Sequence, residues 1–336
     1  MQDKQLSIKD IAAISGVSIA TVSRVLNNKG GYSADTEKKV MAVANTYGYV
    51  SNMAAKTLRE ARSHTIGLIV PNVNNNFFSS LAYHIETYLY GHNYSVFICN
   101  SGNSVEKERN YFRTLAGKGV DGILCISGLN ELTDDILYRS IPVVCIDRRP
   151  QTTQPIPQVS NDDAHAGYIA TRHLLEKGCR HILFISSYLA GYRRADRTSG
   201  YLRALEESGL FADKNYILER PGVDPTQIEV EVLLYQFLQK GLPLDGIIAS
   251  SEPAALGALY ALKRSGLSVP QDVRIVSFDN TLYSLLTTPP LSSIERNPER
   301  LAHTGCDILL DLIDGQSPER METVIPVSLV ERESSR

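Results

Sequence analysis

Short apolar runs alternate with amphipathic helical stretches along most of the chain, starting at Thr65. This alternation predicts parallel β-sheets whose two faces are both covered by helices. Eight such units over about 270 residues favour two doubly wound halves over a single large sheet. The eight apolar runs are residues 65–71, 94–100, 121–127, 142–148, 181–187, 215–219, 245–251 and 274–280.

Polar and aromatic side chains follow several of these predicted strands, at the edge where doubly wound sheets bind ligands. Carboxylates and amides can accept hydrogen bonds from sugar hydroxyls. With an aromatic face beside them, they predict a small sugar-like effector. A strand-end ion pair is the alternative interpretation of Asp147 beside Arg148. The candidate contacts are Asn75, Phe77, Phe78, Ser127, Asp147, Arg148, Ser250, Ser251, Glu252, Asp279 and Asn280.

The first 50 residues follow a different pattern, that of three short helices. Ser7 and Asp10 form a capping pattern at the first helix, and Gly16 ends it. Ser18 can cap a second helix and Ser33 a third. Two short helices joined by a tight turn that contains glycine predict a helix-turn-helix. The side chains expected to face inward are Ile8, Ile11, Ala12, Val22, Val25, Leu26, Val40, Val43, Ala44 and Tyr47.

The second of these helices carries side chains suited to a DNA major groove. Arg24 is the candidate for bidentate contact with guanine, and Ile19 and Ala20 are candidates for contact with thymine methyl groups. Residues 1–63 hold nine Lys and Arg against five Asp and Glu, so this segment carries +4 in a chain of net charge −3. Ordinary packing of a helix pair is the alternative. The short polar side chains on this helix are Ser18, Thr21, Ser23, Asn27 and Asn28.

The segment IKDIAAISGVSIATVSRVLN resembles the headpiece of the LacI/GalR family of bacterial transcription regulators. The segment NMAAKTLREARSHTIGLIVP resembles the hinge helix that leads into that family's first core strand. The resemblance implies that Leu58 wedges into the minor groove at the operator centre, with Lys56 beside it on the DNA. Because such a short helix is marginal alone, we expect it to fold when two chains meet on DNA.

The resemblance covers essentially the whole chain and implies a core similar to periplasmic sugar-binding proteins. A core of this kind crosses between two subdomains three times, here near residues 161–163, residues 292–296 and Pro326. The implied parts are a DNA-binding headpiece (1–50), a hinge helix or linker (51–63) and an effector-binding core (64–336), whose N-subdomain is 64–161 and 295–325 and whose C-subdomain is 162–293 and 326–336.

The resemblance also assigns effector contacts to particular residues. The family places an Arg three residues before a Gly–aromatic pair, which is Arg197 in RTSGY here. Its strand-end carboxylates match Asp147 and Asp279. Where the family usually has Asn-Asp, this chain has Ser251-Glu252, and a serine lacks the paired donor and acceptor of an amide. That departure puts the identity of the effector in doubt.

Two further arginines, Arg193 and Arg194, precede Arg197. We expect them to form a solvated face at the start of a helix. The alternative is that they reach the cleft and select an anionic effector, such as a sugar phosphate or a sugar acid. Binding of neutral sugars without their phosphates would contradict that alternative.

Several function classes are disfavoured. The sequence has no Walker A, G-x-G-x-x-G, H-E-x-x-H or G-x-S-x-G motif, so we expect no enzyme activity and no cofactor. No CxxC pair occurs among the cysteines, and we expect buried reduced thiols with no metal site. No apolar run approaches the roughly 20 residues of a membrane span, and MQDKQLSIKD has no signal core, so a cytoplasmic protein is expected. The cysteines are Cys99, Cys125, Cys145, Cys179 and Cys306.

These observations predict a ligand-responsive repressor of a carbohydrate-utilisation operon. We expect a homodimer that binds a pseudo-palindromic double-stranded operator. A small sugar-like effector would close the cleft and bias the hinge between ordered and disordered states. Two alternatives stay open: a catabolite-control-type regulator whose co-repressor is a phosphoprotein, and a transport-type sugar-binding protein.

Overall fold

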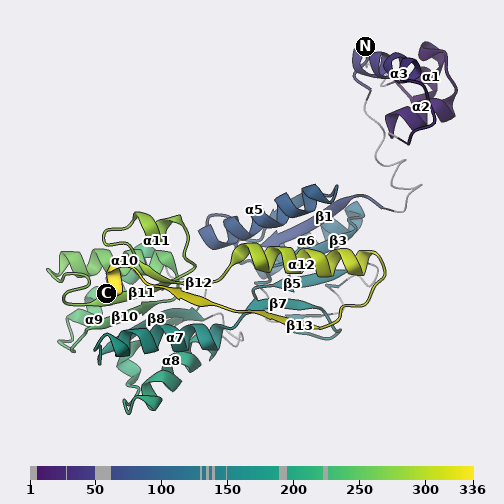
Figure 1. Ribbon diagram of the computed structural model, residues 1–336. Coiled ribbons are helices and arrows are strands. Elements are labelled where there is room, and N and C mark those ends of the chain that lie inside the picture. Colours follow the sequence, from purple (N-terminus) through teal and green to yellow (C-terminus); the bar gives the residue numbers. More distant parts are fainter. Residues whose placement is uncertain are drawn as a thin grey trace. The chain divides into compact units, whose positions relative to one another are not determined.

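The computed structural model describes residues 6–27, 29–49, 62–128, 131–133, 136–137, 141–148, 150–188, 195–221 and 226–336. The chain divides into two compact units, Met1–Ser63 and His64–Arg336 (Figure 1). The smaller unit is helical, and the larger one contains two six-stranded sheets. Among the described residues, no helix is long and apolar enough to cross a membrane.

Within residues 6–49 the smaller unit has three helices: α1 (Ile8–Ser15), α2 (Ile19–Leu26) and α3 (Ala34–Thr46). The predicted caps are confirmed, because Ser7, Ser18 and Ser33 each accept a hydrogen bond from a backbone N–H in the first turn. Gly16 ends α1 in a left-handed conformation, which makes the tight turn into α2 possible.

The core of this unit is formed by Ile11, Val22 and Val40, which are fully buried. Tyr47 is not part of it, contrary to our expectation. It follows the last helical residue of α3, and its side chain is 56% exposed. Two tyrosines outside the helices, Tyr32 and Tyr49, pack against this core instead.

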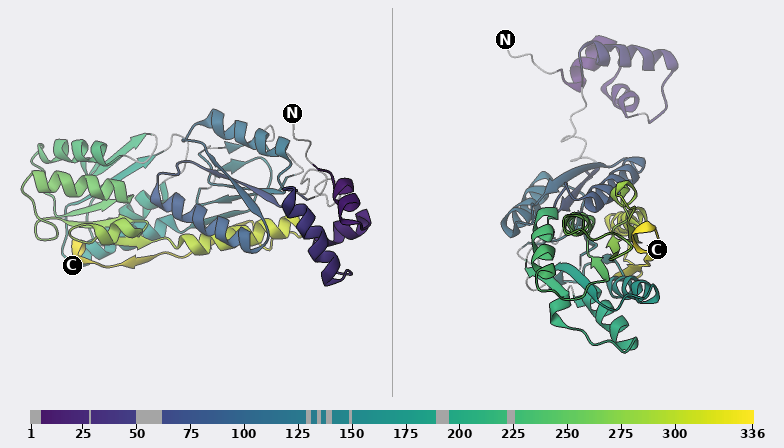
Figure 2. Two further views of the ribbon diagram at one scale, coloured as in Figure 1. Left: turned by 90° about the horizontal axis from the view of Figure 1, so that it is seen from above. Right: turned by 90° about the vertical axis from the view of Figure 1, so that its left-hand side faces the viewer.

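The first sheet of the larger unit has the strand order β13-β7-β5-β3-β1-β2, and all of its pairings are parallel. Helices α5 and α12 lie side by side on one face and α6 covers the other (Figures 1 and 2). We call this sheet and its helices the N-subdomain. Its elements are β1 (Thr65–Val70), α5 (Asn76–Gly91), β2 (Ser95–Asn100), α6 (Val105–Lys118), β3 (Gly122–Cys125), β5 (Val143–Ile146), β7 (Gln158–Asn161), α12 (Pro298–Ile313) and β13 (Glu322–Ile325).

The second sheet has the order β14-β12-β11-β10-β8-β9, and only its β12–β14 pair is antiparallel. Helices α7 and α8 cover one face, and α9 and α10 cover the other. We call this sheet and its helices the C-subdomain. Its elements are α7 (Asp163–Glu176), β8 (Ile182–Tyr188), α8 (Ala195–Glu207), β9 (Ile217–Pro221), α9 (Gln227–Leu238), β10 (Gly246–Ala249), α10 (Glu252–Arg264), β11 (Arg274–Phe278), α11 (Leu282–Leu286), β12 (Ser292–Glu295) and β14 (Ser328–Val330).

In the interior apolar strands, successive side chains pack against opposite covered faces of the sheet, whereas the edge strand β2 is largely exposed. Leu68 packs against α5 and α12, whereas its neighbour Ile69 packs towards α6. In the C-subdomain, Leu183 faces α9 and α10 while Phe184 faces α7 and α8. The predicted class, two doubly wound parallel sheets behind a helical headpiece, is therefore confirmed.

Each of the eight apolar runs contains a strand, but residues 215–219 begin with the 3-10 helix Lys214–Tyr216 before β9 starts. The sequence reasoning missed β7 and β12, which are four residues long and carry polar side chains such as Ser292 and Ser293. It also missed a two-stranded sheet of β4 (Glu131–Leu132) and β6 (Gln151–Thr152). All five cysteines are free, and Cys99 is only partly buried.

Candidate functional site

The exposed side of α2 carries the candidate DNA contacts. Ile19, the first residue of α2, is 46% exposed. Ala20 and Arg24 on the same helix are also exposed. These three side chains make no contribution to the buried core that Val22 and Val25 form. The exposed face of α2 therefore has the mixed apolar and cationic character that we predicted for contact with base edges.

Other predicted DNA contacts already have partners within the helix. Ser18 caps α2, and its hydroxyl lies 2.8 Å from that of Thr21. The Asn27 amide donates to the Ser23 carbonyl at 2.7 Å and closes the helix C-terminus. These side chains can meet phosphates only through their remaining lone pairs and hydrogens. The predicted contacts Lys56 and Leu58, like Asn28, lie outside the described residues.

The centre of the candidate effector site is a residue that the sequence reasoning did not select. Arg296 follows β12, where the chain returns to the N-subdomain, and is 5% exposed. Its Nη1 donates to Asp279 Oδ1 at 3.1 Å, and its Nη2 donates to Asp147 Oδ1. The guanidinium carbon lies 3.9 Å from the centroid of the Phe77 ring. Predicted contacts from both subdomains therefore converge on one buried arginine.

The same arginine is tied to the crossings between the subdomains. Asn161, which ends β7, accepts from Arg296 Nε at 3.2 Å through its side-chain oxygen. Its Nδ2 donates to the backbone carbonyls of Arg296 at 2.9 Å and of Ile325, the last residue of β13, at 3.3 Å. One amide thus links all three segments that run from one sheet to the other. We call Phe77, Asp147, Asn161, Asp279 and Arg296 the Arg296 cluster.

Backbone geometry aims the two carboxylates at this point. Asp147 and Asp279 each directly follow a buried strand, β5 and β11. Both have left-handed backbones, with φ of 68° and 88°, which bulky L-residues rarely adopt. Aspartate enters this region more readily than most residues, and such backbones cluster at active sites and ligand clamps.

Burial and neighbouring charges shift the pKa values of Asp279 and Arg296. Burial raises the pKa of the Asp279 carboxyl to about 6, although Arg296 and Arg197 oppose the shift. Burial lowers the pKa of Arg296, but Asp147, Asp279 and Asp163 outweigh this and hold it above its ordinary value. The guanidinium is therefore a permanent cation between the carboxylates.

Arg197 is positioned by an unusually close pair of helices. A Cβ on Gly167 of α7 would lie 2.0 Å from the Arg197 carbonyl oxygen, and a Cβ on Gly200 of α8 would lie 2.0 Å from the Ala164 carbonyl oxygen. Only glycine at both positions permits this approach. Arg197 Nε then donates to Asp163 at 2.7 Å, and its Nη1 donates to the Ser250 carbonyl at 2.9 Å.

Three predicted effector contacts have partners within the protein. Asn75 caps α5 and Ser251 caps α10. The hydroxyl of Ser127, which is fully buried, donates to Glu108 at 2.6 Å. A short polar side chain after a strand is as useful for capping the next helix as for binding a ligand, which explains why sequence alone did not separate the two roles.

Glu252 also turns inward, towards α11. It accepts from the backbone N–H of Thr281 at 2.8 Å and of Ser284 at 3.2 Å, and from both of their hydroxyls. The carboxylate is almost fully buried, so it holds the start of α11 in place. The unusual Ser251-Glu252 pair is thus occupied with helix positioning.

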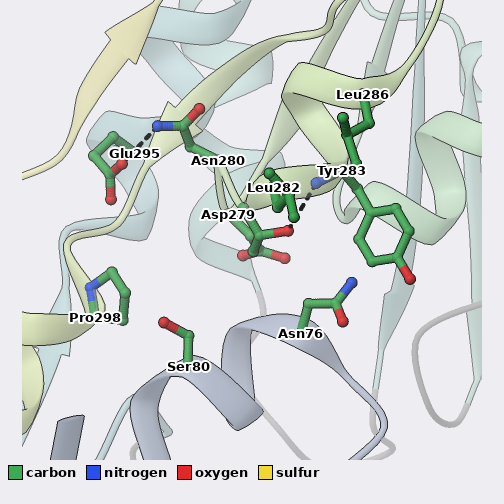
Figure 3. Close-up of a pocket in the computed structure, with 10 residues that line it drawn as sticks. Asn76, Ser80, Asp279, Asn280, Leu282, Tyr283, Leu286, Glu295 and Pro298 are labelled. Carbon is green, nitrogen blue, oxygen red and sulfur yellow. Dashed lines mark hydrogen bonds between the residues drawn. The ribbon is translucent and has the colours of Figure 1, made fainter. Parts of the chain in front are cut away.

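A pocket of about 510 Å³ lies between the subdomains beside the Arg296 cluster (Figure 3). Asn76 and Ser80 of α5 face Tyr283 and Leu286 of α11 across it. Asp279 belongs to both the pocket and the cluster. The remaining lining residues are Asn280, Thr281, Leu282, Glu295 and Pro298.

Arg193 and Arg194 lie outside the described residues. The described residues hold no group of three His, Cys, Asp or Glu side chains that could bind a metal ion. Neither Arg296 nor Asn161 was a candidate contact from the sequence. The segment SSIERNPER contains one signal that could have identified Arg296. Arg296 directly precedes Asn297 and Pro298, which begin α12.

Two family profiles match the chain: "Bacterial regulatory proteins, lacI family" over residues 7–52, and "Periplasmic binding protein-like domain" over residues 171–335. The HTH-type transcriptional repressor PurR of Vibrio atlanticus is 32% identical over 329 residues, which cover 97% of each chain.

Two solved structures extend the comparison. The lac repressor dimer bound to operator and the anti-inducer ONPF matches with a TM-score of 0.83 and 25% identity over 99% of both chains. A periplasmic binding protein/LacI transcriptional regulator from Alkaliphilus metalliredigens, complexed with D-xylulofuranose, matches with a TM-score of 0.71 and 30% identity over 81% of this chain and 99% of that one. These relatives are transcriptional regulators, not enzymes.

Proposed function

The chain belongs to the lacI family of bacterial regulatory proteins, and from this premise we propose that it represses transcription as an effector-controlled homodimer on a pseudo-palindromic operator. Residues 1–50 bind DNA in this proposal, residues 51–63 form the hinge and residues 64–336 bind the effector. A transport-type sugar-binding protein does not account for the lacI-family match over residues 7–52.

The observation that carries the proposal is the meeting of Asp147 and Asp279 in one buried cluster, because each comes from a different subdomain. A ligand that changes the contacts of these carboxylates necessarily acts on both subdomains. It shifts their arrangement only if it binds one arrangement better than the other. The affinity of the headpiece for the operator then depends on which arrangement the two subdomains adopt.

DNA binding is supported by the exposed apolar and cationic side chains of α2. We expect Arg24→Ala to lose about 1–3 kcal/mol of operator affinity, the range for a bidentate arginine–guanine contact. Operators can be selected from random duplexes, and affinity can be measured by fluorescence anisotropy at fixed salt. Lys39→Ala is the control, because Lys39 lies in the same unit and pairs with Asp35 on α3. Equal losses for the two variants would contradict specific contact by Arg24.

Homodimerisation is supported by an exposed apolar surface on the C-subdomain. On α9, Ile228, Val232 and Tyr235 recur at helical spacing and are all exposed. The neighbouring α10 adds to it, and large exposed apolar patches mark interaction surfaces. Helix α10 contributes Tyr260, whose side chain is exposed.

We expect Ile228→Lys to shift the protein from dimer towards monomer in sedimentation experiments. Phe211→Lys is the matched control, because Phe211 is almost fully exposed and lies in the loop after α8. A dimer that persists unchanged in Ile228→Lys would exclude this surface as the interface.

The effector class has two candidates. The structural neighbour complexed with D-xylulofuranose favours a sugar, as do the carboxylates at the strand ends, and a carbohydrate operon would follow from it. The relatives named PurR favour a purine base.

A thermal-shift panel of neutral sugars, sugar phosphates and purine bases separates these candidates. A ligand at about 100 times its dissociation constant adds roughly 2.7 kcal/mol, which raises the unfolding temperature by several degrees. A panel without any shift would contradict a small-molecule effector and favour the phosphoprotein co-repressor.

A further inference from the structure

Arg296 holds the place that a cationic ligand would take. Its guanidinium donates to one carboxylate from each subdomain and to the Asn161 side chain. The ring of Phe77 covers one side of the guanidinium at 3.9 Å. All three guanidinium nitrogens therefore have partners. The guanidinium of the chain's own Arg296 occupies the space between Asp147 and Asp279.

Negative charge is nevertheless in excess around the Arg296 cluster. Asp147 and Asp279 pair with Arg296, and Asp163 pairs with Arg197, so three carboxylates face two guanidinium groups. Arg197 is paired with Asp163 at 2.7 Å and also donates to the Ser250 carbonyl. An anionic effector would meet more carboxylates than guanidinium groups. A cationic effector would have to displace Arg296, which is anchored to the crossings through Asn161.

We propose that Arg296 is an internal counter-ion that sets the charge of the effector: the site accepts an uncharged molecule rich in hydroxyl or N–H donors and disfavours anions and cations. This inference rests on the proposed effector function. Such a molecule donates to lone pairs of Asp279 that Arg296 leaves available at the pocket, since a carboxylate has about four acceptor positions. A sugar and a neutral purine base both meet this description.

Replacement of Arg296 by alanine converts the site into one that requires a cation. Asp147 and Asp279 would then lose the guanidinium that pairs with both of them, and removal of one partner of a buried ion pair strongly destabilises a folded protein. Methylguanidinium has the shape and charge of the missing group. We expect it to raise the unfolding temperature of full-length Arg296→Ala by several degrees at concentrations up to about 50 mM, far below those that denature proteins.

Two comparisons make this rescue specific. Sodium chloride at the same concentration controls for ionic strength, and Arg264→Ala controls for the substitution, because Arg264 is exposed and pairs with Glu231 on the surface. Neither this control nor the wild type should respond to methylguanidinium. An equal response of all three proteins would overturn the counter-ion role.

The pH dependence of stability gives a second readout, which a purely structural role of Arg296 would not change. In Arg296→Gln the unpaired carboxylates hold protons more tightly when folded than when unfolded, so the variant gains stability as pH falls. Its deficit in unfolding temperature relative to wild type should be largest near pH 8 and smallest near pH 5. Arg296→Lys keeps the charge and should show little pH dependence. A deficit of Arg296→Gln that is constant with pH would refute the proposal.

The preference for an uncharged effector is tested by comparing the affinities of neutral and charged ligands. An effector found in the thermal-shift panel should bind at least ten times more tightly than its phosphorylated or amino-substituted analogue. Stabilisation of the wild type by an anion alone would overturn the uncharged-effector assignment. Methylguanidinium rescue and the pH profile need neither DNA nor effector, so they can succeed or fail independently of the proposed repressor function.

Discussion

Replacement of Gly200 by alanine tests how the fold positions Arg197. The added Cβ would lie 2.0 Å from the Ala164 carbonyl oxygen and 2.6 Å from the Tyr168 nitrogen. Both atoms belong to the backbone of α7 and cannot rotate away, so α7 and α8 must separate. Overpacking of this kind typically costs about 1–3 kcal/mol, and more where neither side can give way.

Alanine has a higher helix propensity than glycine, which stabilises the folded protein by at most about 1 kcal/mol. We therefore expect a net loss of about 2 kcal/mol, which corresponds to roughly 4–8 °C in unfolding temperature for a domain of this size. The displaced α8 would also draw Arg197 away from Asp163 and the Ser250 carbonyl. Effector affinity should fall together with stability.

Thermal unfolding followed by circular dichroism measures the first effect, and titration calorimetry with the identified effector measures the second. Gly117→Ala is the matched control, because Gly117 lies in α6 and a Cβ there would meet nothing within 4 Å. The control should be unchanged or slightly stabilised. A Gly200→Ala protein as stable as Gly117→Ala would refute the close-approach argument.

Three further substitutions test other parts of the protein. Leu58→Ala should weaken binding to a selected operator much more than binding to random DNA in anisotropy titrations; equal losses would exclude a minor-groove wedge. Asp279→Asn should flatten the dependence of stability on pH, measured by urea unfolding. Burial raises the pKa of Asp279 from 3.8 to about 6, so the proton binds more tightly in the folded state, and the associated stability is lost as pH rises through this window. Glu252→Ala should destabilise the protein by about 3–5 kcal/mol, because buried donors of Thr281 and Ser284 lose their acceptor. An unfolding midpoint unchanged from wild type would show that Glu252 does not hold α11.

Local signals in the sequence were sufficient for the headpiece and for the fold class. The caps Ser7, Ser18 and Ser33 act on backbone groups three residues away, so their role depends on neighbours that the sequence itself supplies. Long apolar runs such as residues 65–71 identify central strands, because a strand buried on both faces excludes polar side chains. Tyr47 was placed wrongly because burial at a helix end depends on the angle at which the chain leaves the helix.

The candidate site was only partly predictable. Asp147 and Asp279 were identified because each follows a strand, but nothing local indicated that one guanidinium would join them. Arg296 lies 149 residues from the first and 17 from the second, and only the crossing of the chain between two sheets brings the three together. Ser127 and Ser251 show the converse: their residue types suited a ligand, whereas burial and a helix start gave them partners inside the protein. The sequence by itself determined the headpiece helices and the strands with long apolar runs, because those preferences act over a few residues; the short polar strands β7 and β12 escaped it. Tertiary structure alone decided which polar groups meet at the boundary between the sheets, because that choice depends on topology and on the desolvation of charges buried there.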